Sequence, residues 1–240
     1  MNIILIYFAI KYKGDWDKIF KALEEKEKVP ISEMNKLEEE LKTSDQKIIT
    51  ILDINYPNKL KEAYKPPFVL WLKGDEKLLS QKMISFTGNI SNETSKEKIT
   101  QFMPELTNRH TLVSASYKGV DVDVANQNGQ GMVYILANGI NKPYLNHTEK
   151  NIDLLISEYP PDQHLKKEHF ANRNRLIAAM CESLILINSE KNGGINSLIT
   201  NFLNLGKEIY CFVGGGSDDG NSELIKQGAN LITSIKDICD

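Results

Sequence analysis

Hydrophobic residues follow two different patterns along this chain of 240 residues. In residues 15–27 and 32–42 they recur every three or four positions, which is typical of amphipathic helices. Ser32 is expected to cap the second of these helices. The first ten residues are almost wholly apolar and indicate the start of a buried N-terminal element. We therefore expect a small helical module over residues 1–52.

Short apolar runs alternate with amphipathic segments in the rest of the chain, after a connector that contains Pro57, Pro66 and Pro67. The runs are residues 68–72, 83–87, 111–115, 132–137, 153–156, 183–187, 208–213 and 230–232. The amphipathic segments are residues 95–108, 120–128, 169–180, 195–205 and 221–227. Continuous apolar runs predict strands covered on both faces, and their alternation with helices predicts right-handed βαβ units. The expected fold is α/β: an extended Rossmann-like, doubly wound, mostly parallel sheet over residues 53–240.

Composition and charge narrow the class of protein. Lys and Arg number 29 and Asp and Glu number 32, so the formal net charge is −3. Such a balance excludes a protein that coats nucleic acid indiscriminately, although it allows a local basic patch. Three widely separated cysteines indicate no zinc site and a reducing compartment. The apolar first ten residues are about half the length that spans a bilayer, so we expect a cytoplasmic protein without a membrane segment.

Small and polar residues recur where the predicted strands end. In a doubly wound sheet, ligands bind beyond the carboxyl ends of the strands. The segments in question are residues 87–89, 114–121, 138–139, 157–160, 188–190 and 213–216. Gly, Ser and Asn there suit an anionic ligand, although each one alone could simply close a turn. Neither a dinucleotide fingerprint nor a phosphate-binding P-loop is present in the sequence, so no nucleotide cofactor and no metal is expected.

Arginine is scarce and unevenly placed. The chain has three arginines, which are Arg109, Arg173 and Arg175. Arginine keeps its charge and binds phosphate in a bidentate manner, which lysine does not. The basic residues just upstream of the pair are His164, Lys166 and Lys167. We interpret this segment as a phosphate site. The alternative is a solvated helix start or an internal ion pair between Arg173 and a carboxylate such as Glu158 or Glu190, and we expect one of the two arginines to be structural.

Taken together, these motifs resemble the DprA/Smf DNA-processing proteins in kind and order. They are Gly88, residues 114–121, residues 157–160, the F-x-x-R-N-R-x-I-A run at 170–178, Glu190, the S-L-I-T run at 197–200 and Gly228-Ala229. The resemblance covers roughly residue 56 to the C-terminus. It implies a Rossmann domain that binds single-stranded DNA, protects incoming DNA and loads the recombinase RecA during natural transformation. It also implies a homodimer, for which residues 195–205 or 221–227 are reasonable surfaces, and no catalytic activity.

Residue by residue, the resemblance places phosphate contacts at Lys118, Arg173 and Arg175. The other residues expected at the DNA site are Asn174, Gly88, Ser114 and Gly119, and the expected supporting residues are Asp121, Glu190, Ser197 and Thr200. Asn174 and Asp121 are expected to hold the loops that present the cations. Phosphate contacts bind a strand without sequence preference. The aromatic residues near the predicted cleft that could stack on bases are Tyr117, Tyr144, Tyr159 and Phe170.

Several positions depart from the family pattern. Asn89-Ile90 follows Gly88 where the family has a Ser/Thr-Arg pair, so one cation is missing. Ala125 replaces a histidine four residues after Asp121. Val213-Gly214 replaces Pro-Gly, and Asn196 replaces a glycine before the S-L-I-T run. These changes predict weaker DNA binding or a diverged ligand. The chain ends soon after Ile232, so no C-terminal winged helix is expected.

Two other classes of function stay open. Residues 193–197 resemble the G-G-x-G-T loop of lysine-decarboxylase-like nucleotide phosphoribohydrolases, but Thr200 and Asn201 stand where those enzymes need a carboxylate. The four histidines are dispersed, with no serine or cysteine nucleophile beside them. A protein–protein adaptor with a vestigial cleft is the other alternative. Steep salt dependence of binding to oligo-dT would separate a strand-binding protein from an adaptor.

Overall fold

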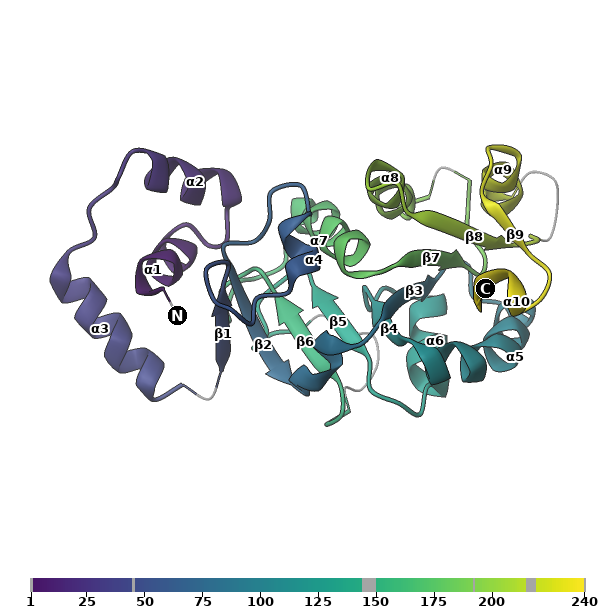
Figure 1. Cartoon of the computed structure of the whole chain (residues 1–240), viewed down its shortest axis with the longest axis horizontal. Coiled ribbons are helices and arrows are strands. Elements are labelled where there is room, and N and C mark those ends of the chain that lie inside the picture. Colours follow the sequence, from purple (N-terminus) through teal and green to yellow (C-terminus); the bar gives the residue numbers. More distant parts are fainter. Residues whose placement is uncertain (1, 45, 144–149, 192, 215–218, 240) are drawn as a thin grey trace.

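A computed structural model of the chain describes all residues except 1, 45, 144–149, 192, 215–218 and 240. Its described part contains one nine-stranded sheet with the order β1-β2-β6-β5-β4-β3-β7-β8-β9 (Figure 1). The strands are β1 (Lys47–Thr50), β2 (Val69–Gly74), β3 (Met83–Thr87), β4 (Thr111–Ser114), β5 (Val133–Leu136), β6 (Leu154–Ser157), β7 (Ser183–Leu186), β8 (Glu208–Phe212) and β9 (Asn230–Ile232). Strands β3 to β9 pair in parallel, whereas β2 is antiparallel to both β1 and β6. The expected mostly parallel sheet is confirmed.

Helices cover both faces of the sheet. They are α1 (Ile3–Lys11), α2 (Trp16–Glu24), α3 (Ile31–Lys42), α4 (Asn58–Lys61), the 3-10 helix η1 (Glu76–Ser80), α5 (Glu93–Arg109), α6 (Val120–Gln127), α7 (Lys167–Met180), α8 (Asn196–Asn204), α9 (Gly220–Lys226) and α10 (Lys236–Cys239). The buried side chains of α1, α5 and α6 share one core, and those of α4, α7 and α8 share the other (Figure 1). Within β2, Trp71 faces the first core and Leu70 and Leu72 face the second, because successive side chains of a strand alternate.

The winding of the sheet reverses at β3. From β3, strands β4, β5 and β6 extend the sheet to one side, and β7, β8 and β9 extend it to the other. Loops that follow neighbouring strands diverge at such a reversal, which opens a crevice at the carboxyl ends of the strands. The fold therefore places a ligand site beside the loops that follow β3 and β7.

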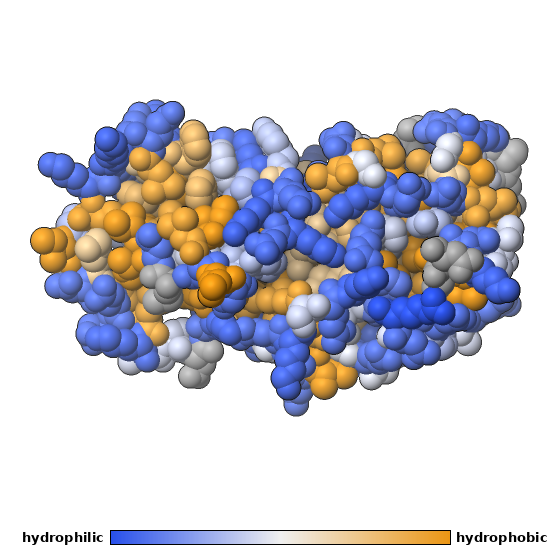
Figure 2. Space-filling view, viewed as in Figure 1, coloured by the Kyte–Doolittle hydropathy of each residue, from blue (hydrophilic) through white to orange (hydrophobic). Residues whose placement is uncertain are grey.

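The N-terminal helices differ from the predicted module in two respects. Strand β1 lies inside the predicted range 1–52 but pairs with β2, so the helical segment ends before Lys47. Helix α1 packs its buried side chains into the same core as β2. Figure 2 shows hydrophobic surface gathered at the end of the molecule that these helices form. The predicted cap at Ser32 is wrong, because α3 begins at Ile31 after Pro30 and has no side-chain cap. No helix in the described ranges is long and apolar enough to cross a lipid bilayer.

The C-terminal end of α7 is held by a half-buried lysine. Lys207 Nζ donates hydrogen bonds to the carbonyl oxygens of Ala178, Ala179 and Cys181, at 2.7, 2.8 and 2.6 Å. The last carbonyl groups of an α-helix have no N–H donor within the helix, and the three acceptors of Lys207 include such groups. The ammonium group therefore anchors the helix whose other end reaches the ligand crevice.

We expect Lys207→Met to lower the free energy of unfolding by about 1–3 kcal/mol, because carbonyls buried at the helix end lose charged donors. Urea denaturation followed by circular dichroism measures this loss. Lys61→Met, at an exposed lysine of α4, is the matched control and should change stability by less than about 0.5 kcal/mol. Equal effects of the two substitutions would show that Lys207 does not anchor the helix.

Candidate functional site

A cleft of about 760 Å³ lies at the carboxyl ends of β3, β4 and β7, where the winding of the sheet reverses. Its lining comes from the end of β3 and the loop after it (Thr87, Gly88, Asn89), from the loop after β4 and the start of α6 (Ala115, Tyr117, Lys118, Asp121), from the loop after β7 and the start of α8 (Glu190, Gly194, Ile195, Ser197, Leu198), and from α7 (Lys167, Phe170, Ala171, Arg173, Asn174). Segments that are far apart in the sequence thus meet at one edge of the sheet. This is the position at which open α/β sheets bind ligands.

The guanidinium group of Arg173 forms the buried cationic part of the cleft. The residue is only 6% exposed. Its Nη1 donates to Ala115 O at 2.8 Å, and Nε and Nη2 donate to Asn174 Oδ1 at 3.4 and 3.3 Å. These bonds within the described chain use three of the five N–H groups, which leaves two for a ligand. Burial lowers the pKa of Arg173 to about 10, and the nearby Asp121 opposes that shift, so the group remains cationic at neutral pH.

The carboxylate of Asp121 ties together the loops that follow β3 and β4. Its Oδ1 accepts a hydrogen bond from Thr87 Oγ1, and its Oδ2 accepts from Ser114 Oγ at 3.1 Å and from Tyr117 N at 3.0 Å. Burial raises the pKa of Asp121, and these hydrogen bonds and Arg173 oppose the shift. Ser114 lies behind the cleft, where it positions Asp121. Gly119 is the N-cap residue before α6 and has a φ of +91°, a conformation that residues with a Cβ rarely adopt.

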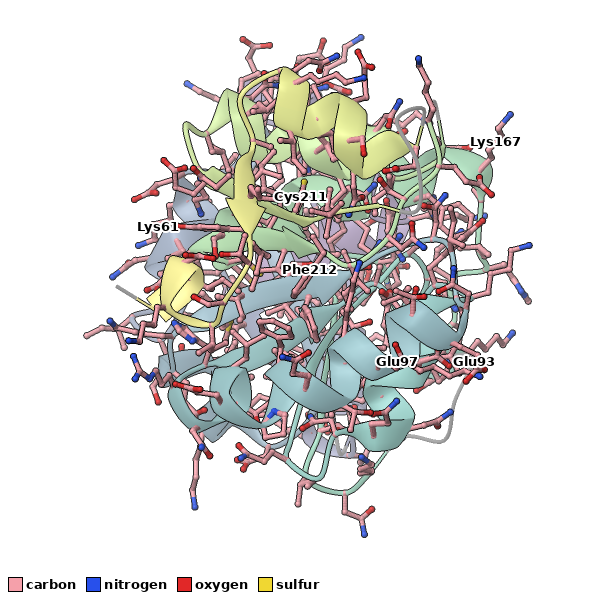
Figure 3. The ribbon with its side chains drawn as sticks, turned by 90° about the vertical axis from the view of Figure 1, so that its right-hand side faces the viewer. Lys61, Glu93, Glu97, Lys167, Cys211 and Phe212 are labelled. Atoms are coloured by element: carbon pink, nitrogen blue, oxygen red, sulfur yellow. The ribbon has the colours of Figure 1, made fainter. Side chains whose placement is uncertain are left out.

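Two exposed lysines and two aromatic rings form the outer wall of the cleft. Lys118 follows β4 and Lys167 begins α7, and both line the cleft. Figure 3 shows Lys167 projecting from the same side of the molecule as Glu93, which follows β3. Tyr117, which is 43% exposed, packs edge to face on Phe170 with ring centroids 6.5 Å apart. The Arg173 guanidinium lies 5.5 Å from the Phe170 ring centroid. Flat apolar surface and positive charge therefore adjoin each other.

The loops after β3 and β7 are fastened to each other by Asn89. Its Oδ1 accepts from Glu190 N at 3.0 Å, and its Nδ2 donates to Glu190 Oε2 at 3.2 Å. A Cβ on Gly88 would lie 2.4 Å from Asn188 O, so this close approach of the two loops requires glycine. The sequence showed Asn89 as one of the polar residues at a strand end and as part of a missing cation pair, but not as a link between loops. Its partner is 101 residues away, so no local pattern could have revealed the link.

Arg175 lies outside the cleft. Its Nη2 is 2.6 Å from Glu158 Oε2 and its Nη1 is 3.3 Å from Glu158 Oε1, with side chains 9% and 5% exposed. Residues two apart on an α-helix point about 200° apart, so Arg173 and Arg175 cannot face the same site. Burial raises the pKa of Glu158, and Arg175 opposes the shift. The expected phosphate contact from Arg175 is therefore not supported by its position. The ion pair with Glu158, which was the alternative for Arg173, is formed by Arg175 instead.

The other expected residues divide into those at the cleft and those elsewhere. Gly88, Lys118, Asp121, Arg173, Asn174, Glu190 and Ser197 line it. Thr200 is exposed and lines a smaller pocket, of about 340 Å³, between α8 and α9. Of the candidate stacking residues, Tyr159 is buried against His169, with ring centroids 3.9 Å apart, and Tyr144 falls outside the described residues. In the described ranges, no group of three or more His, Cys, Asp or Glu could hold a metal ion.

Comparisons with known proteins show which family the chain resembles. The family model of DNA recombination-mediator protein A matches residues 47–240, beginning at the first residue of β1. The DNA processing protein DprA of Streptococcus pneumoniae is 30% identical over 204 residues, which span 79% of this chain and 72% of the relative. The DprA of Bacillus subtilis is 32% identical over 209 residues, which span 79% of this chain and 69% of the relative.

Two solved structures share the fold. The X-ray structure of the S. pneumoniae DprA has a TM-score of 0.77 and 24% identity, and the match covers 99% of this chain and 92% of that one. A DprA from Helicobacter pylori, described for its single-stranded DNA binding mode, has a TM-score of 0.71 and 23% identity, with coverage of 82% and 94%. The resemblance drawn from the motifs is confirmed. The chain therefore belongs to the DNA recombination-mediator protein A family.

Proposed function

We propose that this protein binds single-stranded DNA in the cleft, with Arg173, Lys118 and Lys167 in contact with phosphates. The observation that carries the proposal is the buried guanidinium of Arg173 at the wall of the cleft. The chain holds this cation there although its own net charge is −3. A desolvated, preorganised arginine binds an anion more strongly than an exposed one. The related H. pylori protein, described for its single-stranded DNA binding, supports the same ligand.

The form of the cleft suits a single strand. Its volume of about 760 Å³ falls in the range of small-ligand pockets, so it accommodates a short stretch of nucleotides. Tyr117, which is exposed and held against Phe170, offers a ring on which any base can stack, and the cations contact the backbone without reading sequence. Binding of this kind accepts any incoming strand.

Catalysis is not part of the proposal. The carboxylate of Asp121 already accepts three hydrogen bonds, and Glu190 is the exposed carboxylate among the cleft-lining residues. Glu190 is engaged by Asn89, so the described residues that line the cleft include no acid–base pair poised for hydrolysis. We propose that the bound strand is instead protected and delivered to the recombinase RecA during natural transformation, as family membership suggests.

We also propose that two copies pair. Leu203 on α8 is 60% exposed and Leu231 on the edge strand β9 is 42% exposed. Exposed leucines on two late elements, one of them the edge strand of the sheet, provide the kind of apolar surface that a second copy could cover.

The affinity for oligo-dT is expected to fall steeply with salt, and Lys118→Ala is expected to weaken binding several-fold at low salt. Loss of one phosphate contact should reduce the slope of log K against log salt by about 0.7. Fluorescence anisotropy at several salt concentrations measures both quantities. Lys61→Ala is the matched control, because Lys61 projects from the opposite side of the molecule to Lys167 (Figure 3). Absence of binding at low salt would instead favour the adaptor.

A further inference from the structure

We propose that the strand continues from the cleft onto a second basic surface, formed by Lys142, His164 and Lys166 and here called the edge patch. The proposal rests on strand binding in the cleft and extends it. It assigns a role to the basic residues upstream of α7 that do not line the cleft. The ligand is the same polyanion, contacted at phosphates beyond those in the cleft.

The edge patch is continuous with the cleft. Lys167 lines the cleft, Lys166 is the N-cap residue of α7, and His164 lies two residues earlier. Lys142, in the loop that follows β5, places its Nζ 3.2 Å from His164 Nε2. Cationic groups from two loops thus form a row that begins at the wall of the cleft.

Backbone hydrogen bonds hold the two loops of the edge patch together. Gly139 N donates to Gln163 O at 2.9 Å, and Asn141 N donates to Pro161 O at 2.9 Å. A Cβ on Gly139 would lie 2.1 Å from Pro161 O, which shows how closely the loops approach. The spacing of Lys142 and His164 is therefore built into the fold.

The charges of the edge patch favour an anion. Lys142 Nζ lies 3.2 Å from His164 Nε2, and a phosphate beside this pair would accept a hydrogen bond from an N–H group of Lys142 that the imidazole ring does not use. The neighbouring carboxylates are Asp162 and Glu168. Asp162 Oδ1 accepts from Asn141 Nδ2 at 3.1 Å, and Glu168 is exposed in the first turn of α7. Within the described chain, neither Lys142 nor Lys166 forms an ion pair with a carboxylate.

The order of the β-strands in the sheet indicates the path of the bound DNA. Strands β5 and β6 lie beside β4, on the side of the cleft away from β7. A DNA strand that leaves the cleft past Lys167 crosses the carboxyl ends of these two β-strands to reach Lys142. It therefore runs away from the pocket between α8 and α9.

The test compares a short and a long oligonucleotide on the same protein. Fluorescence anisotropy is measured with dT4, chosen as a strand for the cleft alone, and with dT12, chosen to be long enough for the cleft and the edge patch together. Lys142→Ala/Lys166→Ala is expected to weaken dT12 binding about tenfold, to reduce its salt slope by about 1.4, and to leave dT4 binding within about twofold. Lys61→Ala/Lys77→Ala removes two exposed lysines as the matched control and should change neither affinity.

Either of two results would overturn the edge patch. One is equal affinity and equal salt slope of the unsubstituted protein for dT4 and dT12. The other is an unchanged dT12 affinity in the Lys142→Ala/Lys166→Ala variant, which would assign these lysines to a protein partner or to solvent. Failure of cleft binding gives a different result, because dT4 binding would then be absent, or insensitive to substitution of Lys118.

Discussion

Arg173→Ala is expected to weaken binding to oligo-dT by about 30- to 100-fold, far more than loss of either exposed lysine. A charge-assisted bidentate contact to phosphate contributes about 2–3 kcal/mol when the donor is buried and preorganised. Arg173 meets both conditions, since it is 6% exposed and fixed by Ala115 O and Asn174 Oδ1. The loss should be measured by fluorescence anisotropy at one low salt concentration.

Two further variants separate lost binding from lost structure. Arg173→Lys keeps the charge without the planar fork and should bind more weakly than the unsubstituted protein but more tightly than Arg173→Ala. Arg109→Ala removes an exposed arginine at the end of α5 and should bind normally. Circular dichroism reports whether Arg173→Ala remains folded after the carboxylate of Asp121 loses its nearest positive charge. A folded Arg173→Ala variant with normal affinity would rule out Arg173 as the phosphate contact.

The strands after residue 53 were predictable because most of them are apolar runs bounded by turn residues, and β3, β4, β5 and β6 are buried throughout. Strand β1 was not, since it has four residues, begins with the exposed Lys47 and lies at the edge of the sheet. So short a segment carries almost no periodicity. Its pairing with β2 depends on the loop and prolines between them, and the hydrophobic pattern of residues 47–50 does not encode that pairing.

Most of the candidate site followed from one rule about parallel sheets. Residues after β3, β4 and β7 converge because the carboxyl ends of parallel strands share an edge, and Gly88, Lys118 and Glu190 line the cleft for that reason. The sequence did not show that Arg173 faces the cleft and that Arg175 is the structural residue. Helix α7 is buried from Arg173 to Met180, so its hydrophobic pattern does not show which face meets the cleft. Only the packing of Glu158 against α7 identifies Arg175 as the structural residue.

Arg175→Ala is expected to lower the free energy of unfolding by about 3–5 kcal/mol, because it leaves the buried carboxylate of Glu158 without its partner. Glu158→Ala should cost a similar amount, since it leaves a buried guanidinium unpaired. Urea denaturation followed by circular dichroism measures both losses. Replacing the pair together, as in Glu158→Leu/Arg175→Met, should cost much less than the two single losses combined, because no unpaired charge remains.

The same variants test whether Arg173 binds the DNA and Arg175 has a structural role. At low temperature and without denaturant, the folded fraction of Glu158→Leu/Arg175→Met should bind oligo-dT within about threefold of the unsubstituted protein, since Arg175 lies outside the cleft. Arg173→Ala should show the reverse behaviour, with a large loss of affinity and a smaller loss of stability. If Arg175→Ala instead lost affinity as strongly as Arg173→Ala while its unfolding midpoint stayed unchanged, the ion pair would not be structural and Arg175 would have to turn toward the strand.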